Sequence, residues 1–128
     1  MQLFFERDIF NFIVGNSGAH LKNYRSIRYK DKESIRLTPV YDIVCSKLVI
    51  PDEEDSALTI NGKKNILKRG DFESLAGYLN IPIKIRYEKF IKSSSLMTTI
   101  IRDSKIKTDS QKRFIDIIKE RLSRLALA

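Results

Sequence analysis

The chain has 128 residues, of which 42% are hydrophobic and 31% charged, and its net charge is +8. This length suits one domain with a buried core, and the apolar fraction argues against wholesale disorder. No apolar run approaches the roughly 20 residues of a membrane-spanning helix, so we expect no membrane contact. A single cysteine, Cys45, excludes an internal disulfide. Together with a first segment unlike a signal peptide, it predicts a cytoplasmic protein.

The positive charge allows a nucleic-acid interpretation. Lysines and arginines are nevertheless spread along the chain from Arg7 to Arg124, in blocks of at most two. The sequence has no recognition-helix signature and no aromatic stacking platform. Both a solvated basic surface and a site for a polyanion remain open at this point.

The first predicted element is a buried helix over residues 3–14, in which apolar side chains leave a short polar face. Gly15 and Asn16 follow and should end the helix. Alternating residues then predict a short pair of strands over 24–29 and 34–37, with a turn at 31–33. Pro39 disfavours helix just before it.

The acidic run 51–55 reads as a solvated surface loop without the ligand pattern of a calcium loop. Residues 57–67 resemble a small hairpin around Asn61 and Gly62, since Asn-Gly supplies the positive φ angles of a tight turn. Asp71 is a predicted N-cap for a helix over 72–79.

Pro82 separates this helix from a long one over 83–102, whose centre is doubtful at the serines 93–95. Thr108 or Asp109 should cap the last helix. Its apolar residues recur at helical spacing: Phe114, Ile115, Ile118, Leu122 and Leu125. The fold class is therefore α+β and mainly helical, with residues 1–128 forming one domain without repeats or linkers.

Two segments have polar residues in patterns that suggest chemistry. Residues 15–24 read GNSGAHLKNY, a polar loop directly after a buried helix. Residues 37–44 read LTPVYDIV and place an aspartate, Asp42, among apolar residues. In isolation Asn23 and Asp42 could be turn-formers that bond their own backbone. His20 alone fits a hydrogen-bonding residue, Tyr41 a packing residue, and Cys45 a small buried hydrophobe.

Together the two segments resemble the catalytic and metal loops of HipA-type serine/threonine kinases, the toxins of bacterial toxin–antitoxin pairs. That family's catalytic loop reads Asn-x-Asp-x-His-x-Lys-Asn, and its metal loop reads Pro-x-Tyr-Asp. The resemblance extends over about residues 3–80 and implies a protein-kinase-like C-lobe with a minor β-hairpin near the two loops.

The resemblance also implies roles for single residues. Phosphoryl transfer needs a carboxylate that orients the attacking hydroxyl and oxygen ligands that hold magnesium. Asn23 and Asp42 match the magnesium ligands, Lys22 would neutralise phosphate charge, and His20 would brace the loop. Gly18 stands where the family has its catalytic aspartate, which is the main departure from the pattern.

The cofactors implied by the resemblance are Mg²⁺ and ATP, with weak or absent binding expected here. The sequence has no glycine-rich phosphate loop and no strand with an ATP-contacting lysine. We therefore expect a C-terminal lobe that lacks its N-lobe and is inactive alone. Implied partners are a separately encoded N-lobe, a helix-turn-helix antitoxin and a protein substrate in the translation machinery. A decayed toxin, half of a split kinase, and a non-catalytic basic module that binds an antitoxin or nucleic acid all remain open.

Overall fold

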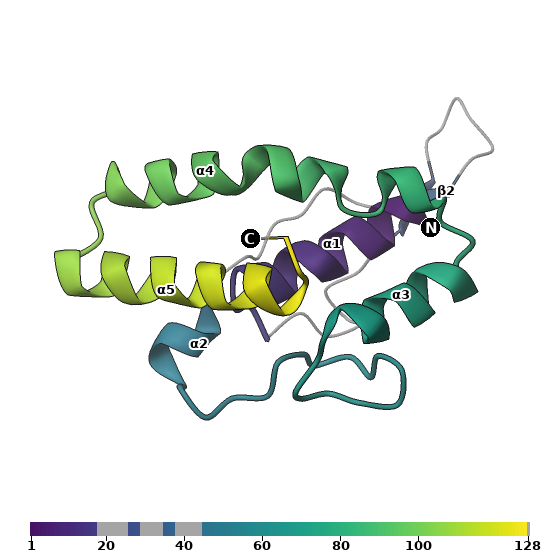
Figure 1. Ribbon diagram of the computed structural model, residues 1–128, viewed down its shortest axis with the longest axis horizontal. Helices are drawn as coiled ribbons and strands as arrows, with labels where there is room; N and C mark the ends of the chain where they lie inside the picture. The colour runs from purple at the N-terminus through teal and green to yellow at the C-terminus, as the bar shows by residue number, and fades with distance from the viewer. Residues whose placement is uncertain (18–25, 29–34, 38–44, 128) are drawn as a thin grey trace.

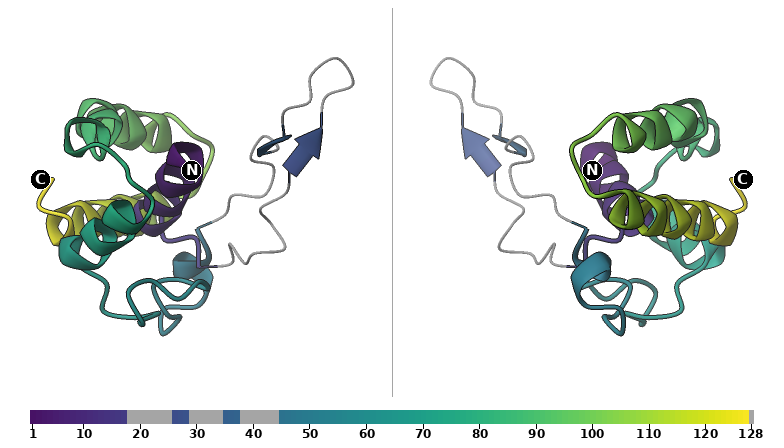
Figure 2. Two further views of the ribbon diagram at one scale, coloured as in Figure 1. Left: turned by 90° about the vertical axis from the view of Figure 1, so that its right-hand side faces the viewer. Right: turned by 90° about the vertical axis from the view of Figure 1, so that its left-hand side faces the viewer.

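The structure is a computed structural model, and it describes residues 1–17, 26–28, 35–37 and 45–127. Helix α1 (Gln2–Ile13) runs through the middle of the molecule, with α3, α4 and α5 grouped around it (Figures 1 and 2). Its buried residues Phe5, Ile9, Phe12 and Ile13 follow helical spacing. The helix predicted over residues 3–14 is confirmed.

Helix α1 ends at Ile13, and Gly15 terminates it two residues later, as expected from the sequence. Gly15 has a φ of 71°, and its N–H donates to the Phe12 carbonyl at 3.3 Å. The next N–H, of Asn16, donates to the Asn11 carbonyl at 2.8 Å. This pair of bonds is a Schellman motif, which needs a left-handed residue at the first position after the cap.

Two three-residue strands follow, β1 (Ser26–Arg28) and β2 (Ile35–Leu37). They pair antiparallel, with Ser26 opposite Leu37 and Arg28 opposite Ile35. Both fall inside the ranges that the alternation indicated. Among the described residues, the strands comprise only these two short segments and the other elements are helices, so the described part of the protein is mainly helical.

A short helix, α2 (Ser46–Val49), precedes a long irregular segment. The sequence did not indicate α2. Farther on, Asn61 and Gly62 both have positive φ, 51° and 75°, and Ile60 pairs with Lys63 across them. The tight Asn-Gly turn is therefore present, but its flanks form an isolated bridge instead of two strands.

Helix α3 (Arg69–Tyr78) begins three residues earlier than predicted, so Asp71 is not its N-cap. The carboxylate of Asp71 instead reaches back from the first turn and accepts the N–H of Lys68 at 2.9 Å. It also accepts hydrogen bonds from Asn61 at 2.9 Å and from Lys63 at 3.0 Å. Asp71 thereby fastens the 61–63 turn to the start of α3.

The long helix predicted over 83–102 is divided. Residues Ile83–Ile85 form one 3₁₀ turn, and α4 (Glu88–Arg102) starts only after it. The doubtful centre at the serines is helical. Ser93 Oγ donates to the Lys89 carbonyl at 2.6 Å and Ser94 Oγ to the Ile91 carbonyl at 3.2 Å, so the hydroxyls bond within the helix.

Helix α5 (Thr108–Arg124) lies beside α4 (Figure 1). Lys107 is its N-cap, without a side-chain bond, so neither Thr108 nor Asp109 caps it. The predicted apolar face is confirmed, because Ile115, Ile118, Leu122 and Leu125 are buried and Phe114 is partly buried. Helices α1, α3, α4 and α5 enclose one core, in which the rings of Phe12 and Phe72 lie 5.0 Å apart.

Candidate functional site

The residues predicted to carry chemistry lie outside the described residues. They are Gly18, His20, Lys22, Asn23 and Asp42. Their roles as catalytic, phosphate-binding and magnesium-binding positions therefore stay predictions. The structure does describe the residues on either side of the segment 18–44 and the helices that they contact.

The two ends of this segment are fastened to each other. The N–H of Ser17 donates to Ser46 Oγ at 2.9 Å, and Ser46 Oγ donates to the Gly15 carbonyl at 3.3 Å. The N–H of Lys47 donates to the same carbonyl at 3.1 Å. The residues just after α1 and those at the start of α2 therefore meet at one junction.

Gly15 is the residue on which this junction depends. A Cβ at this position would lie 3.1 Å from Lys47 Cβ, 3.2 Å from Cys45 Sγ and 3.2 Å from Ile117 Cγ2. The backbone of Gly15 is thus enclosed by the residues just after the segment and by α5. Its positive φ adds a second reason for glycine.

Cys45 lies at the same junction and is half-buried instead of fully buried. Burial raises the pKa of its thiol, against smaller opposing effects of the Leu48 N–H and the Arg121 charge. A thiol with a raised pKa stays protonated and unreactive at neutral pH. Cys45 is therefore a packing residue here, as its sequence context suggested.

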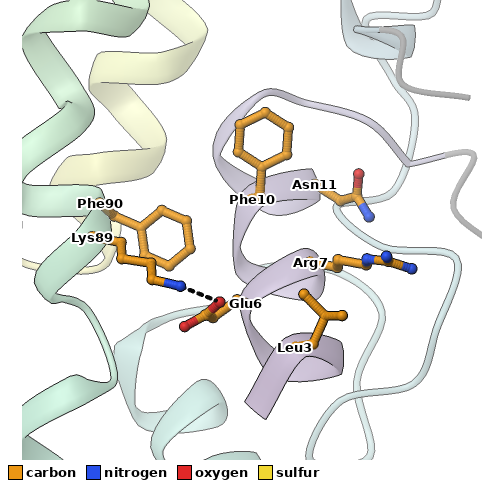
Figure 3. A pocket seen from close by; sticks show the side chains of 7 residues that line it. All are labelled: Leu3, Glu6, Arg7, Phe10, Asn11, Lys89 and Phe90. Atoms are coloured by element: carbon orange, nitrogen blue, oxygen red, sulfur yellow. Dashed lines mark hydrogen bonds and ion pairs between the residues drawn. The ribbon is translucent and has the colours of Figure 1, made fainter. Parts of the chain in front are cut away.

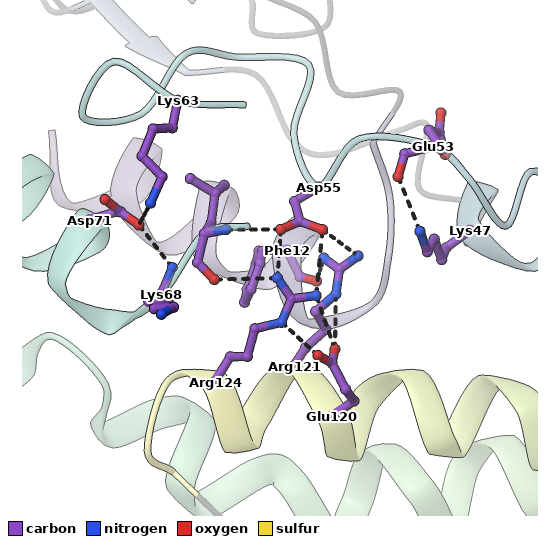
Figure 4. Close-up of polar contacts among 11 residues, drawn as sticks. Phe12, Lys47, Glu53, Asp55, Lys63, Lys68, Asp71, Glu120, Arg121 and Arg124 are labelled. Carbon is purple, nitrogen blue, oxygen red and sulfur yellow. Dashed lines mark hydrogen bonds and ion pairs between the residues drawn. The ribbon is translucent and has the colours of Figure 1, made fainter. Parts of the chain in front are cut away.

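A buried ion-pair cluster joins Asp55 to helix α5 (Figure 4). Asp55 is 3% exposed, and its carboxylate pairs with Arg124 Nη1 at 2.6 Å and Arg121 Nη2 at 3.1 Å. It also accepts the N–H of Leu67 at 3.0 Å. The expectation that residues 51–55 form a wholly solvated loop is therefore wrong for Asp55.

Arg121 connects this cluster to the last turn of α1. It is 1% exposed, donates to the Phe12 carbonyl at 2.9 Å, and places its guanidinium 4.6 Å from the centre of the Phe12 ring. Because Asp55 follows the segment 18–44 and Phe12 precedes it, Arg121 braces both sides. No local pattern in the sequence could have paired Asp55 with arginines near the C-terminus.

An apolar pocket of about 300 Å³ lies between α1 and α4 (Figure 3). Leu3, Phe10 and Phe90 form its walls, and Lys89 pairs with Glu6 at 3.0 Å across it. The pocket thus offers hydrophobic surface and an ion pair that is already formed. Within the described ranges, no group of three or more His, Cys, Asp or Glu side chains could hold a metal ion.

The comparison with protein families decides the membership. The model of the HipA-like C-terminal domain matches residues 1–103. The chain belongs to this family. The match begins with α1, spans the segment with all five predicted site residues, and ends just after α4.

Among curated proteins, the chain is similar to the one named putative kinase Y4dM of Sinorhizobium fredii (strain NBRC 101917 / NGR234). It is 30% identical over 84 residues, which is 64% of this chain and 20% of the relative. The chain therefore aligns with about a fifth of that protein.

Helix α5 lies beyond the matched residues, yet it supplies Arg121 and Arg124 to Asp55. This HipA-like domain thus completes its core with a helix that lies outside the residues matched by the family model. In the described part of the chain, no helix is long and apolar enough to cross a membrane.

Proposed function

We propose that this HipA-like domain is the C-terminal lobe of a serine/threonine kinase of the toxin–antitoxin type, acting in the cytoplasm and inactive by itself. The helices would form the kinase-like C-lobe, with the β1–β2 pair as a hairpin beside the catalytic and metal loops. Asn23 and Asp42 would hold Mg²⁺, Lys22 would contact the phosphates of ATP, and His20 would brace the loop.

One observation carries the proposal: the family match covers both motif-bearing loops, and the segment that contains them is closed at its base. Ser17 and Ser46 join the ends at 2.9 Å. The catalytic loop follows Ser17 and the metal loop precedes Ser46, so the contact between these two serines keeps the bases of the two loops together. Two residues that bind the same ion must come from neighbouring loops. The relative's name supports kinase chemistry at low identity.

The nucleic-acid alternative rests on the net charge of +8. Several cations of the described part are already committed to intramolecular contacts, which weakens it. Arg121 and Arg124 pair with Asp55, and Arg86 pairs with Glu73. We therefore favour the kinase lobe, with an N-lobe or an antitoxin as its partner.

The isolated chain is expected not to transfer phosphate from ATP to itself or to generic protein substrates. The missing carboxylate at Gly18 should cost roughly 10²–10⁴-fold by loss of general-base catalysis, and the absence of nucleotide-positioning residues should cost more. The measurement is incorporation of labelled γ-phosphate with Mg²⁺ present.

Gly18→Asp alone is expected to remain inactive, because it restores the carboxylate but not the nucleotide contacts. Robust labelling of the unaltered chain that disappears in Asp42→Ala would contradict the proposed inactivity. Labelling that Asp42→Ala leaves unchanged would not involve Asp42 and would be assigned to a contaminant or to another site.

A further inference from the structure

A second pocket lies on the part of the molecule formed by α1, α3 and the segment around residues 57–64. Its volume is about 410 Å³. Phe4, Leu58, Ile60 and Leu75 give it mainly apolar walls. None of these residues belongs to the segment 18–44, which contains all five residues of the predicted kinase site.

Asp8 forms part of the wall of this pocket and has no counter-charge within the described part of the chain. The residue is 4% exposed, and its Oδ2 is buried without a hydrogen-bond partner. No ion pair to Asp8 is present among the described residues. Burial raises the pKa of this carboxyl from 3.8 to about 7. An unpaired buried carboxyl is costly, and such groups in folded proteins ordinarily meet a donor.

Lys64 is the other ionisable residue among those that line the pocket. It is exposed to solvent, and its ammonium group makes no ion pair with Asp8 in the described structure. The pocket therefore presents one buried acceptor, apolar walls and a cation that faces water. Among the described residues, the carboxyl therefore has no counter-charge that an entering cation would have to displace.

We propose that this pocket binds an organic cation, a primary ammonium or guanidinium group on an apolar body, through the carboxylate of Asp8. The cation would supply the hydrogen bonds that Asp8 lacks, and the body would lie against Phe4 and Leu75. Such a group can come from a free small molecule or from a lysine or arginine side chain of another polypeptide. The site is independent of the proposed kinase function.

The first test uses stability without ligand. Folding raises the pKa of this carboxyl, so the folded state favours the protonated form. The free energy of unfolding should therefore fall as the pH rises from about 4 to about 7. Asp8→Asn should therefore raise the melting temperature at pH 8 by about 5 °C or more, and by little at pH 4. Asp52→Asn, at an exposed carboxyl, is the matched control and should change neither value.

The second test measures binding to the full chain by chemical shifts of the Phe4, Thr59 and Lys64 amides. The probe is butylguanidinium, and the neutral butylurea is its control. We expect saturable shifts with butylguanidinium alone, with higher affinity at pH 8 than at pH 5 because binding needs the ionised carboxylate. Asp8→Asn, which should fold at least as well, should weaken binding by about tenfold or more.

An acetylated and amidated Ala-Arg-Ala peptide separates the two sources. Tighter binding of the peptide than of butylguanidinium assigns the pocket to a polypeptide side chain, and exclusion of the peptide assigns it to a free cation.

Two binding results would overturn the proposal. One is the absence of saturable shifts up to about 50 mM butylguanidinium, a concentration well above a millimolar dissociation constant. The other is equal binding by Asp8→Asn. Lys64→Gln should leave the pH dependence of melting unchanged. A larger pH dependence would mean that Lys64 itself neutralises Asp8, which also overturns the proposal.

Discussion

Asp55→Asn is expected to lower the free energy of unfolding by about 3–5 kcal/mol, the cost of removing one partner from a buried ion pair. The substitution leaves Arg121, which is 1% exposed, without its counter-charge. It also weakens the contact with Arg124 and replaces an acceptor of the Leu67 N–H. Because these bonds join α5 to the segment after α2, their loss should destabilise the whole core.

The pH dependence of stability gives this prediction a second readout. Burial raises the pKa of Asp55, but the Arg124 hydrogen bond, the Leu67 N–H and the Arg121 charge outweigh it and hold the pKa below 3.8. A lowered pKa stabilises the fold above the unfolded value, and this contribution is lost as the pH falls through the folded value. The free energy of unfolding should thus fall less steeply with decreasing pH in Asp55→Asn than in the unaltered chain.

Denaturant titration measures both effects, with Glu120→Gln as the control. Glu120 also pairs with Arg124, at 2.6 Å, but its side chain is about half exposed. An exposed pair contributes at most about 1 kcal/mol, so Glu120→Gln should be nearly neutral. Equal effects of the two substitutions would contradict the bracing role of Asp55.

Gly15→Ala is expected to cost about 2–5 kcal/mol, because two penalties add. The φ of 71° costs a residue with a Cβ roughly 1–2 kcal/mol. The new methyl group would also meet Lys47, Cys45 and Ile117 at 3.1–3.2 Å, and such overpacking costs typically 1–3 kcal/mol. The junction at the base of segment 18–44 should loosen together with the end of α1.

Gly77→Ala is the matched control for this substitution. Gly77 lies inside α3, and a Cβ there meets no atom within 4 Å. Alanine in a helix interior is favoured over glycine by up to about 1 kcal/mol, so this variant should be stabilised. If thermal melting ranked Gly15→Ala with Gly77→Ala, the enclosure of Gly15 would be wrong.

Local patterns in the sequence predicted the helical elements well. The spacing of apolar residues located α1 and α5, and Gly15 and the Asn61-Gly62 turn followed from the conformations that glycine permits. The start of α3 was misplaced because an aspartate accepts a backbone N–H equally well from the N-cap or from the first turn. Pro82 was recognised as a break, but the 3₁₀ turn after it was not.

The burial of charged residues could not be predicted in this way. Asp55 belongs to a run of acidic residues in which Asp52 and Glu54 are exposed, and its partners lie 66 and 69 positions along the chain. Asp8 looks like part of the polar face of an amphipathic helix until α3 and the 57–64 segment cover it. Burial of this kind depends on tertiary packing. For the predicted kinase site, the structure adds the closed base at Gly15, Ser17 and Ser46.

The central claim is that the two family loops bring Asn23 and Asp42 to one divalent-cation site, and Mn²⁺ tests it most directly. Mn²⁺ occupies oxygen sites that suit Mg²⁺ and broadens the nuclear magnetic resonance signals of nearby nuclei. Substoichiometric Mn²⁺ added to the ¹⁵N-labelled chain should broaden the amides around Asn23 and around Asp42 together. Asp42→Ala should abolish the broadening at both loops, whereas Glu54→Gln, at an exposed carboxyl, should not. Broadening of one loop without the other, or broadening unchanged in Asp42→Ala, would contradict the claim.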